Sequence, residues 1–284
     1  MAHAPATRPF AFGTLIVLAA ASWLMAAPRA SVPALAAAYV AEYQRQLTSI
    51  VADELYVQEI RAQTPADPGT PRARTLRAEV FFIFAAAQRE WMAIRDVREV
   101  DGQPLAGAGS VRETLRDLPA GRVADRMKSH NAQFNLGRIT RNINEPTLAL
   151  LVLDESHRSR FRFKSEKWPD RVSRARIRLA FQERERPTLI RSHTGGPIFV
   201  SGELHVEPDT GRIWHSMLRA TVEGIRVQLT TEYTFDARLG LLLPSVFHEE
   251  YERGTAAGSA EHELIVAEAR YSNFRRFDVL SRIR

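Results

Sequence analysis

The sequence predicts an α+β protein, mainly antiparallel β, in which a curved sheet wraps a few helices. Apolar residues recur with period two from Leu76 to Phe84 and again through most of the chain after His157, the pattern of half-buried strands. A helical pattern interrupts these strands between about residues 110 and 154. Short turns, with no helix between them, separate the later strands, which favours antiparallel pairing.

The first 36 residues are predicted to be a signal peptide. An arginine precedes the apolar stretch Thr14–Ala27, and no acidic residue comes before Glu42, which is the layout of a secretory signal. The stretch is shorter than the roughly 20 residues of a membrane-spanning helix. Ala34 and Ala36 fit a cleavage site, although its position stays open. We expect a periplasmic or secreted protein without a lipid anchor, because no cysteine follows the stretch.

Residues 37–284 are expected to form a single domain that opens with an amphipathic helix over Ala34–Ala52. Its apolar side chains recur three and four residues apart at Tyr39, Val40, Tyr43, Leu47, Ile50 and Val51. The polar segment Gln63–Arg72, with three prolines and a glycine, then breaks the chain. Leu76, Ala78, Val80, Phe82 and Phe84 share one face of a first strand, and Trp91–Val100 forms a second that ends at the turn signal Asp101-Gly102.

A helical insert is predicted over about residues 110–154. Ser110 and Asn144 are suitable caps, Gly137 can close a helix, and Leu148–Leu153 is apolar on all sides, so protein or ligand must cover it. Pro208 and Gly211 predict a hairpin turn at 207–212. The strand candidates after His157 are Arg158–Lys164, Arg171–Gln182, Thr188–Ser192, Ile198–Glu207, Arg212–Ala220, Ile225–Phe235, Leu242–Glu252 and Leu264–Val279.

The composition excludes several classes of protein. There is no cysteine, so disulfide scaffolds, thiol enzymes and cysteine-ligated metal sites are ruled out. With 45% hydrophobic and 25% charged residues, the chain has the balance of a globular protein rather than a disordered tail. The formal charge of +6 over 284 residues gives only a weak attraction to anionic surfaces.

The order of these segments resembles the LolA-like periplasmic group, which includes lipoprotein carriers and the RseB-type sensor of mislocalised lipoproteins. Four stretches are also similar to a family of uncharacterised secreted bacterial proteins: FRFK at 161–164, EPDTGRI at 207–213, LGLLLPSVFHEEY at 239–251 and ARYSNFRRFDV at 269–279. Over residues 37–284, the resemblance implies a strongly curved half barrel. Its helices would lie over the concave side and leave an apolar cavity for acyl chains.

The resemblance implies an exported, non-enzymatic binding protein for acyl chains, lipids or lipidated partners in the cell envelope. We expect no cofactor, and no nucleic-acid partner because the chain is predicted to be exported and no exposed aromatic residues alternate with Arg176 and Arg178 for base stacking. Two alternatives stay open. A secreted hydrolase would bring a histidine and a carboxylate within hydrogen-bond reach, and a partner-binding envelope sensor would expose an apolar patch. The acyl-chain cavity is expected to be lined by Phe82, Phe84, Leu148, Leu150 and Leu151.

A basic face is predicted on two neighbouring strands, where arginines alternate with apolar residues. Such a face suits phosphate headgroups, an anionic membrane surface or an acidic protein partner. The competing interpretation is the solvated side of a half-buried sheet. The arginines concerned are Arg160, Arg162, Arg174 and Arg176.

The histidines predict neither a metal site nor a catalytic pair. If Val206 pairs with Ile213, then His205 faces Trp214, and His215 points to the other side of the sheet. Adjacent residues of a strand point to opposite faces, which argues against a nucleophile and base at each of three serine–histidine neighbours. These neighbours are Ser156-His157, Ser192-His193 and His215-Ser216.

Overall fold

A computed structural model of the chain describes residues 30–48, 50–66, 71–85, 89–106, 130, 132–141, 143–167, 176–192, 194–254 and 261–276, together with Met1. The chain divides into two compact units, Met1–Ala30 and Ser31–Arg284, and the second contains every element below. The predicted signal stretch, the start of the helical insert and Arg174 lie outside the described residues. Within the described ranges, no helix is long and apolar enough to cross a membrane.

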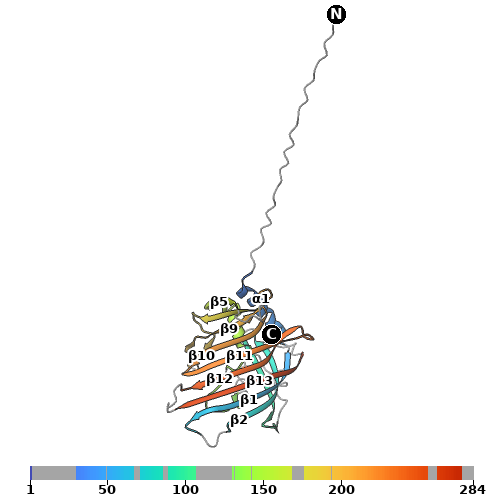
Figure 1. Cartoon of the computed structure of the whole chain (residues 1–284). Coiled ribbons are helices and arrows are strands. Elements are labelled where there is room, and N and C mark those ends of the chain that lie inside the picture. The colour runs from blue at the N-terminus through green and yellow to red at the C-terminus, as the bar shows by residue number, and fades with distance from the viewer. Residues whose placement is uncertain are drawn as a thin grey trace. The chain divides into compact units, whose positions relative to one another are not determined.

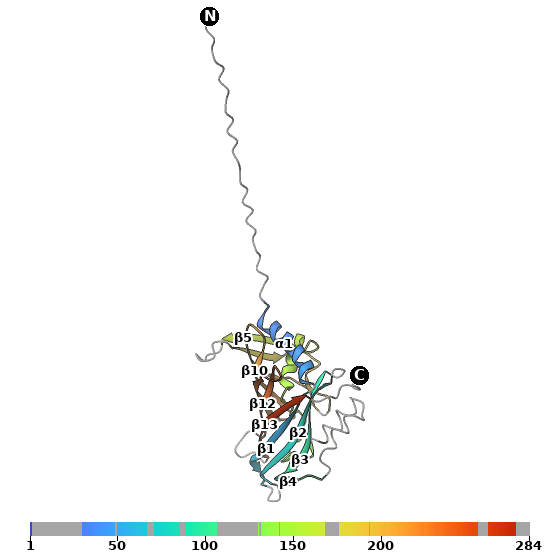
Figure 2. The same ribbon diagram turned by 90° about the vertical axis from the view of Figure 1, so that its right-hand side faces the viewer.

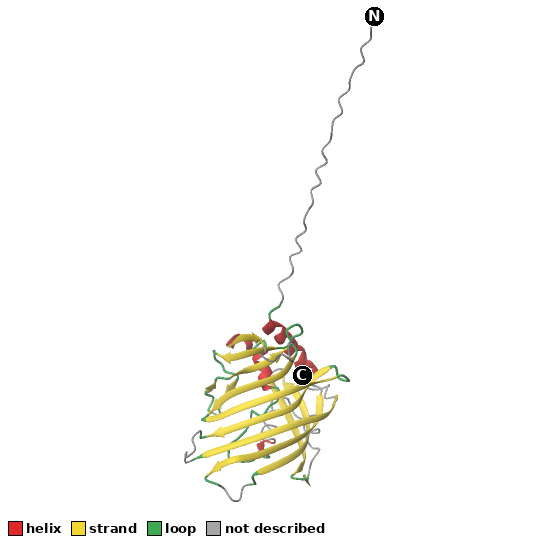
Figure 3. Cartoon of the chain, viewed as in Figure 1, coloured by secondary structure: helices red, strands yellow, loops and turns green. Residues whose placement is uncertain are grey.

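One eleven-stranded antiparallel sheet forms most of the fold, in the order β4-β3-β2-β1-β13-β12-β11-β10-β9-β6-β5 (Figures 1 and 3). The first and last long strands, β1 and β13, pair at its centre. The sheet curves but is not closed, because β4 and β5 are unpaired edges of this order. Its strands are β1 (Ile50–Thr64), β2 (Ala73–Ala85), β3 (Glu90–Val100), β4 (Gln103–Pro104), β5 (Phe161–Lys167), β6 (Ile177–Glu183), β9 (Ser201–Val206), β10 (Ile213–Val222), β11 (Ile225–Asp236), β12 (Leu241–Arg253) and β13 (His262–Arg276).

The predicted antiparallel fold class is therefore confirmed, with smaller elements added to it. The helices include α1 (Val32–Leu47) and two short 3₁₀ helices, η1 (Leu148–Leu153) and η2 (Arg158–Arg160). α1 and η1 contact each other and the sheet (Figure 2). A separate two-stranded sheet pairs β7 (Ile190–Arg191) with β8 (Pro197–Ile198).

The predicted first helix is wrong at both ends. α1 begins at Val32, so Ala34 and Ala36 of the proposed cleavage site lie inside the helix, and Ala36 is buried. It ends at Leu47, and Ile50 and Val51 instead begin β1. Ile50 and Val51 continue the three- and four-residue spacing of the helix only by coincidence. Pairing of β1 with both β2 and β13 decides the structure here, because it satisfies the backbone on both sides.

Strand β1 escaped prediction because its inward face is only partly apolar. Ile50, Ala52, Tyr56 and Ile60 belong to the hydrophobic core, but the buried positions between them hold Glu54 and Gln58. Buried polar residues interrupt the alternation from which strands are predicted. Strand β2 lacks such an interruption, and Leu76, Ala78, Val80 and Phe82 lie in the core as predicted, with Phe84 half-buried beside them.

The turn predictions hold, while several strand bounds shift. Asp101 and Gly102 both have positive φ, 51° and 77°, and connect β3 to β4, and Gly211 has φ 74° in the turn after β9. Arg158–Arg160 forms η2 rather than the start of a strand. The candidate Ile198–Glu207 divides into β8 and β9, and Arg171–Gln182 yields β6 only from Ile177 onwards.

Candidate functional site

The apolar segment η1 occupies the inner face of the sheet, which we define as the face that carries the core cluster. It is a 3₁₀ helix with Thr147 as its N-cap, not the helix capped by Asn144 that the sequence predicts. Five of its six residues are buried, and Leu148 is half-buried. η1 contacts both α1 and β10. The apolar segment Leu148–Leu153 is therefore shielded from solvent by other parts of the protein.

Hydrogen bonds fix both ends of η1. Before it, the carbonyl oxygen of Pro146 accepts from Thr231 Oγ1 at 2.6 Å and from Tyr233 Oη at 3.2 Å. After it, Asp154 accepts from Gln44 Nε2 of α1 at 2.9 Å and from Arg89 Nε at 3.0 Å. The segment between these anchors makes its contacts through apolar side chains.

The Asp154 anchor predicts a specific dependence of stability on pH. Burial raises the pKa of Asp154, but hydrogen bonds from Arg89, Gln44 and Ser156 outweigh it and lower the pKa to about 2. A carboxyl whose pKa is depressed in the folded state stabilises that state above its ordinary pKa, here 3.8. The contribution, about 2 kcal/mol, is lost as the pH falls towards 2.

We expect Asp154→Asn to be less stable than the parent protein at pH 7, and this difference to shrink steadily below pH 4. Urea unfolding curves at pH 7, 5, 4 and 3 measure it. A difference in unfolding free energy that stays constant over this pH range would show that the charge of Asp154 does not stabilise the end of η1.

The five residues predicted to line an acyl-chain cavity all lie on the inner face. Phe82, Leu150 and Leu151 are buried in the core cluster, while Phe84 and Leu148 are half-buried against it. The three buried side chains pack within the core cluster. All five residues therefore lie on the same face as η1.

A buried polar cluster, which the sequence analysis missed, lies on the same inner face. Arg95 Nε donates to Glu54 Oε2 at 2.7 Å, and the Tyr56 and Tyr251 hydroxyls each donate to Glu249 at 2.8 Å. Burial, together with the charge of Glu249, raises the pKa of Tyr56 well above its ordinary value. These residues come from β1, β3 and β12, so no short motif could have indicated them. An apolar ligand would be confined to the part of the inner face near α1 and η1.

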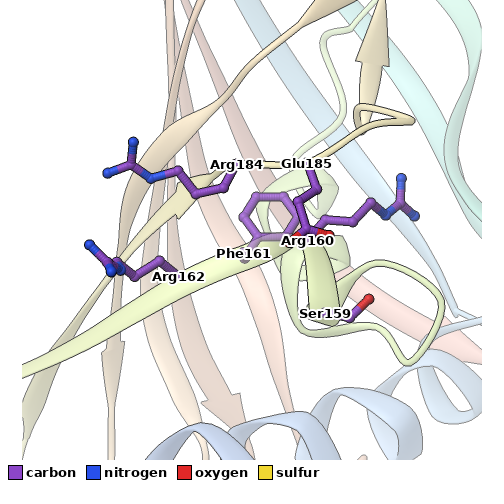
Figure 4. Close-up of a pocket in the computed structure, with 6 residues that line it drawn as sticks. All are labelled: Ser159, Arg160, Phe161, Arg162, Arg184 and Glu185. Carbon is purple, nitrogen blue, oxygen red and sulfur yellow. The ribbon is translucent and has the colours of Figure 1, made fainter.

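The predicted basic face divides into two places. Arg160 and Arg162 line a pocket of about 460 Å³, joined by Arg184, which the sequence analysis missed (Figure 4). Arg162 and Arg184 project in the same direction, and Arg160 projects away from them, donating to the carbonyl oxygens of Ser156 and Pro187. Ser159, Phe161 and Glu185 complete the lining.

Arg176, the other described arginine of the predicted face, and its neighbour Arg178 have different partners. The guanidinium of Arg176 lies over the Trp214 ring, 4.8 Å from its centroid. Arg178 pairs with Glu166 at 2.9 Å and with Glu203 at 2.6 Å. The pairing of β5 with β6 could have indicated Arg184, since Arg162 lies opposite Gln182 and Arg184 follows on the same face.

The neighbours Ser156 and His157 lie in a turn, so the argument from opposite strand faces is wrong for them. Ser156 Oγ lies 2.9 Å from His157 Nδ1. The same hydroxyl also bonds Asp154 Oδ1 at 2.7 Å. In a catalytic triad the carboxylate orients the histidine, whereas here it binds the serine. Arg160 also contacts His157 Nδ1, and burial with this nearby cation lowers the pKa of His157. This arrangement does not support the hydrolase alternative.

The sensor alternative calls for an exposed apolar patch. Beyond Met1, the large hydrophobic side chains that are exposed among the described residues belong to separate elements. They are Val57 on β1, Phe199 between β8 and β9, and Phe235 on β11. Isolated exposed apolar residues are ordinary on protein surfaces and do not indicate a docking site.

Comparison with known proteins finds distant structural matches. No protein-family model and no curated protein matches this sequence. A domain from Vibrio parahaemolyticus assigned to outer membrane lipoprotein sorting is similar at 9% identity and a TM-score of 0.35, covering 89% of this chain and 94% of that one. MucB in complex with MucA(peri) is similar at 12% identity and a TM-score of 0.18, covering 86% and 99%.

Proposed function

We propose that this chain is a non-enzymatic binding protein of the cell envelope, related to the LolA/RseB-like group. Its ligand is an anionic amphiphile such as a lipid, or a lipidated partner that it binds through the acyl chain. The observation that carries the proposal is η1. A run of six apolar residues packs against the inner face of the sheet beside α1 and β10, and hydrogen bonds at Pro146 and Asp154 fix its two ends.

η1 is suited to displacement by an apolar ligand. 3₁₀ helices have poorer hydrogen-bond geometry than α-helices, and runs longer than three or four residues are uncommon. The side chains of η1 pack on the inner face as those of a bound acyl chain would. An acyl chain in the place of η1 would bury apolar surface there at about 0.8 kcal/mol for each methylene. This gain offsets the cost of exposing the buried side chains of the displaced η1.

The arginine pocket supplies a place for an anionic headgroup. β5 is an edge strand, so the inner and outer faces of the sheet meet beside it. Phe161, at the start of β5, belongs to the core cluster and also lines the pocket with Arg162 and Arg184. Forked guanidinium donors suit phosphate and carboxylate groups. A ligand with its head in the pocket would reach the inner face around this edge.

The proposal is tested with an anionic single-chain lysophospholipid and a zwitterionic one of the same chain length, both below their micelle concentrations. The paired substitution Arg162→Gln and Arg184→Gln is expected to weaken binding of the anionic probe about 30-fold at low salt, because each arginine near an anionic group contributes about 1 kcal/mol. Binding of the zwitterionic probe should change little.

A matched control removes two arginines elsewhere. Arg219 and Arg226 line another pocket, of about 420 Å³, and their joint replacement by glutamine alters the net charge equally. If both double variants weaken binding of the anionic probe equally, the effect comes from net charge alone, which would contradict a headgroup site. Shortening the acyl chain by two methylenes should weaken binding more than tenfold. An affinity independent of chain length would contradict the role given to the inner face.

A further inference from the structure

A β-bulge brings two histidines together that the sequence analysis places on opposite faces. Val206 pairs with Ile213 as predicted, but the next pair is His205 with His215, because the register shifts between Ile213 and His215. Trp214 is the extra residue. The imidazole rings stack with centroids 4.2 Å apart and an angle of 17° between their planes. The prediction that the two do not converge is therefore wrong.

These histidines lie in a row of ionisable side chains across five strands. The pairings place Glu166 opposite Arg178, Arg178 opposite His205, His205 opposite His215, and His215 opposite Glu232. The row lies on the outer face, since the neighbouring residue Leu204 belongs to the core. Residues paired in this way project to the same side of a sheet.

Glu203 joins the two histidines from two residues earlier on β9. Its Oε1 lies 3.2 Å from His205 Nε2. One ligand atom each from Glu203, His205 and His215 lies within 4.8 Å of the other two. Their side chains are only 14%, 12% and 16% exposed, so the β-sheet holds them close together in a sheltered place.

We propose that Glu203, His205 and His215 bind a divalent transition metal ion of the Zn²⁺ class on the outer face of the sheet. Two imidazole nitrogens and a carboxylate oxygen are a common ligand set for zinc and leave a fourth position for water. Bonds of 2.0–2.2 Å to one tetrahedral ion place the ligand atoms about 3.4 Å apart. Binding therefore requires the ligand atoms to close in from separations of up to 4.8 Å and the stacked imidazole rings to rotate until both lone pairs point at the ion.

Glu232 is a positioning residue for this site. Its Oε1 lies 2.7 Å from His215 Nδ1. Binding of a carboxylate to one ring nitrogen directs the other towards a metal, and such outer partners typically change metal affinity 10- to 100-fold.

The charged side chains around the site balance one another before an ion binds. Glu166, Glu203 and Glu232 face Lys164, Arg176 and Arg178. Arg178 is bound on both sides by Glu166 and Glu203. Arg178 donates to Glu203 Oε2, whereas the other oxygen of this carboxylate, Glu203 Oε1, is directed at His205.

Zinc titration of a chain without a polyhistidine tag tests the site. We expect saturable binding by calorimetry and a rise in Tm of about 5–10 °C at 100-fold excess over Kd. His205→Gln and His215→Gln should each weaken zinc binding by more than 100-fold, and Glu232→Gln by 10- to 100-fold. His248→Gln and His262→Gln remove histidines that face single glutamates and should leave zinc affinity unchanged.

A second measurement covers variants that fail to fold. Electron paramagnetic resonance of the parent protein with one equivalent of Cu²⁺ should show coupling to two imidazole nitrogens. A spectrum with one nitrogen or none would overturn the proposal, as would zinc affinity that falls equally in the His248→Gln control. Absence of saturable zinc binding would overturn it as well.

Discussion

Replacing Arg95 with methionine is expected to destabilise the folded protein by about 3–5 kcal/mol, because it leaves a buried carboxylate without its cation. The side chains of Arg95 and Glu54 are 3% and 0% exposed, and their ion pair measures 2.7 Å. The guanidinium also lies over the Tyr56 ring, 4.9 Å from its centroid. Methionine can fill much of the space but cannot compensate the charge of Glu54.

Two comparisons make this result specific. The double variant Glu54→Leu with Arg95→Met should recover most of the lost stability, since a buried ion pair replaced by apolar residues is often neutral. Arg77→Met breaks an exposed pair with Glu99, at 3.4 Å, and should cost less than about 1 kcal/mol. Denaturant unfolding measures all three variants. Equal losses in Arg95→Met and Arg77→Met would contradict the assignment of a buried pair.

Replacing Gly211 with alanine is expected to cost about 3 kcal/mol. Gly211 has φ 74°, a conformation that costs other residues about 1–2 kcal/mol. A Cβ added there would also lie 2.3 Å from the backbone carbonyl of Leu35 in α1. This contact is with backbone, so no change of side-chain rotamer relieves it, and overpacking adds a further cost.

Gly224→Ala is the matched control. Gly224 has φ 81° in the turn between β10 and β11, and a Cβ there would meet nothing within 4 Å. It should show only the cost of the positive φ, about 1–2 kcal/mol. Thermal unfolding of both variants separates the two effects. Equal losses would show that α1 does not press on the turn after β9.

The local residue pattern is enough to predict the antiparallel class, most of the later strands and their turns. Leu76–Val80 alternates cleanly, so its inner face is evident. Pro208 and Gly211 indicate their turn because glycine adopts positive φ without strain. The pattern also predicts that Leu148–Leu153 must be covered. The residue pattern does not predict that the protein's own core covers Leu148–Leu153, because this depends on where distant strands place their side chains.

The candidate sites depended on tertiary structure for a related reason. Period-two alternation assigns a residue to a face but does not fix its offset from the partner strand, and a single bulge at Trp214 moves His215 from opposite Leu204 to opposite His205. Likewise, Glu54 interrupts the apolar alternation of β1 in the sequence, and only the tertiary structure shows that Arg95 pairs with it. Sequence patterns report local periodicity, whereas partners from strands far apart in the chain decide which buried charges are neutralised and which side chains share a site.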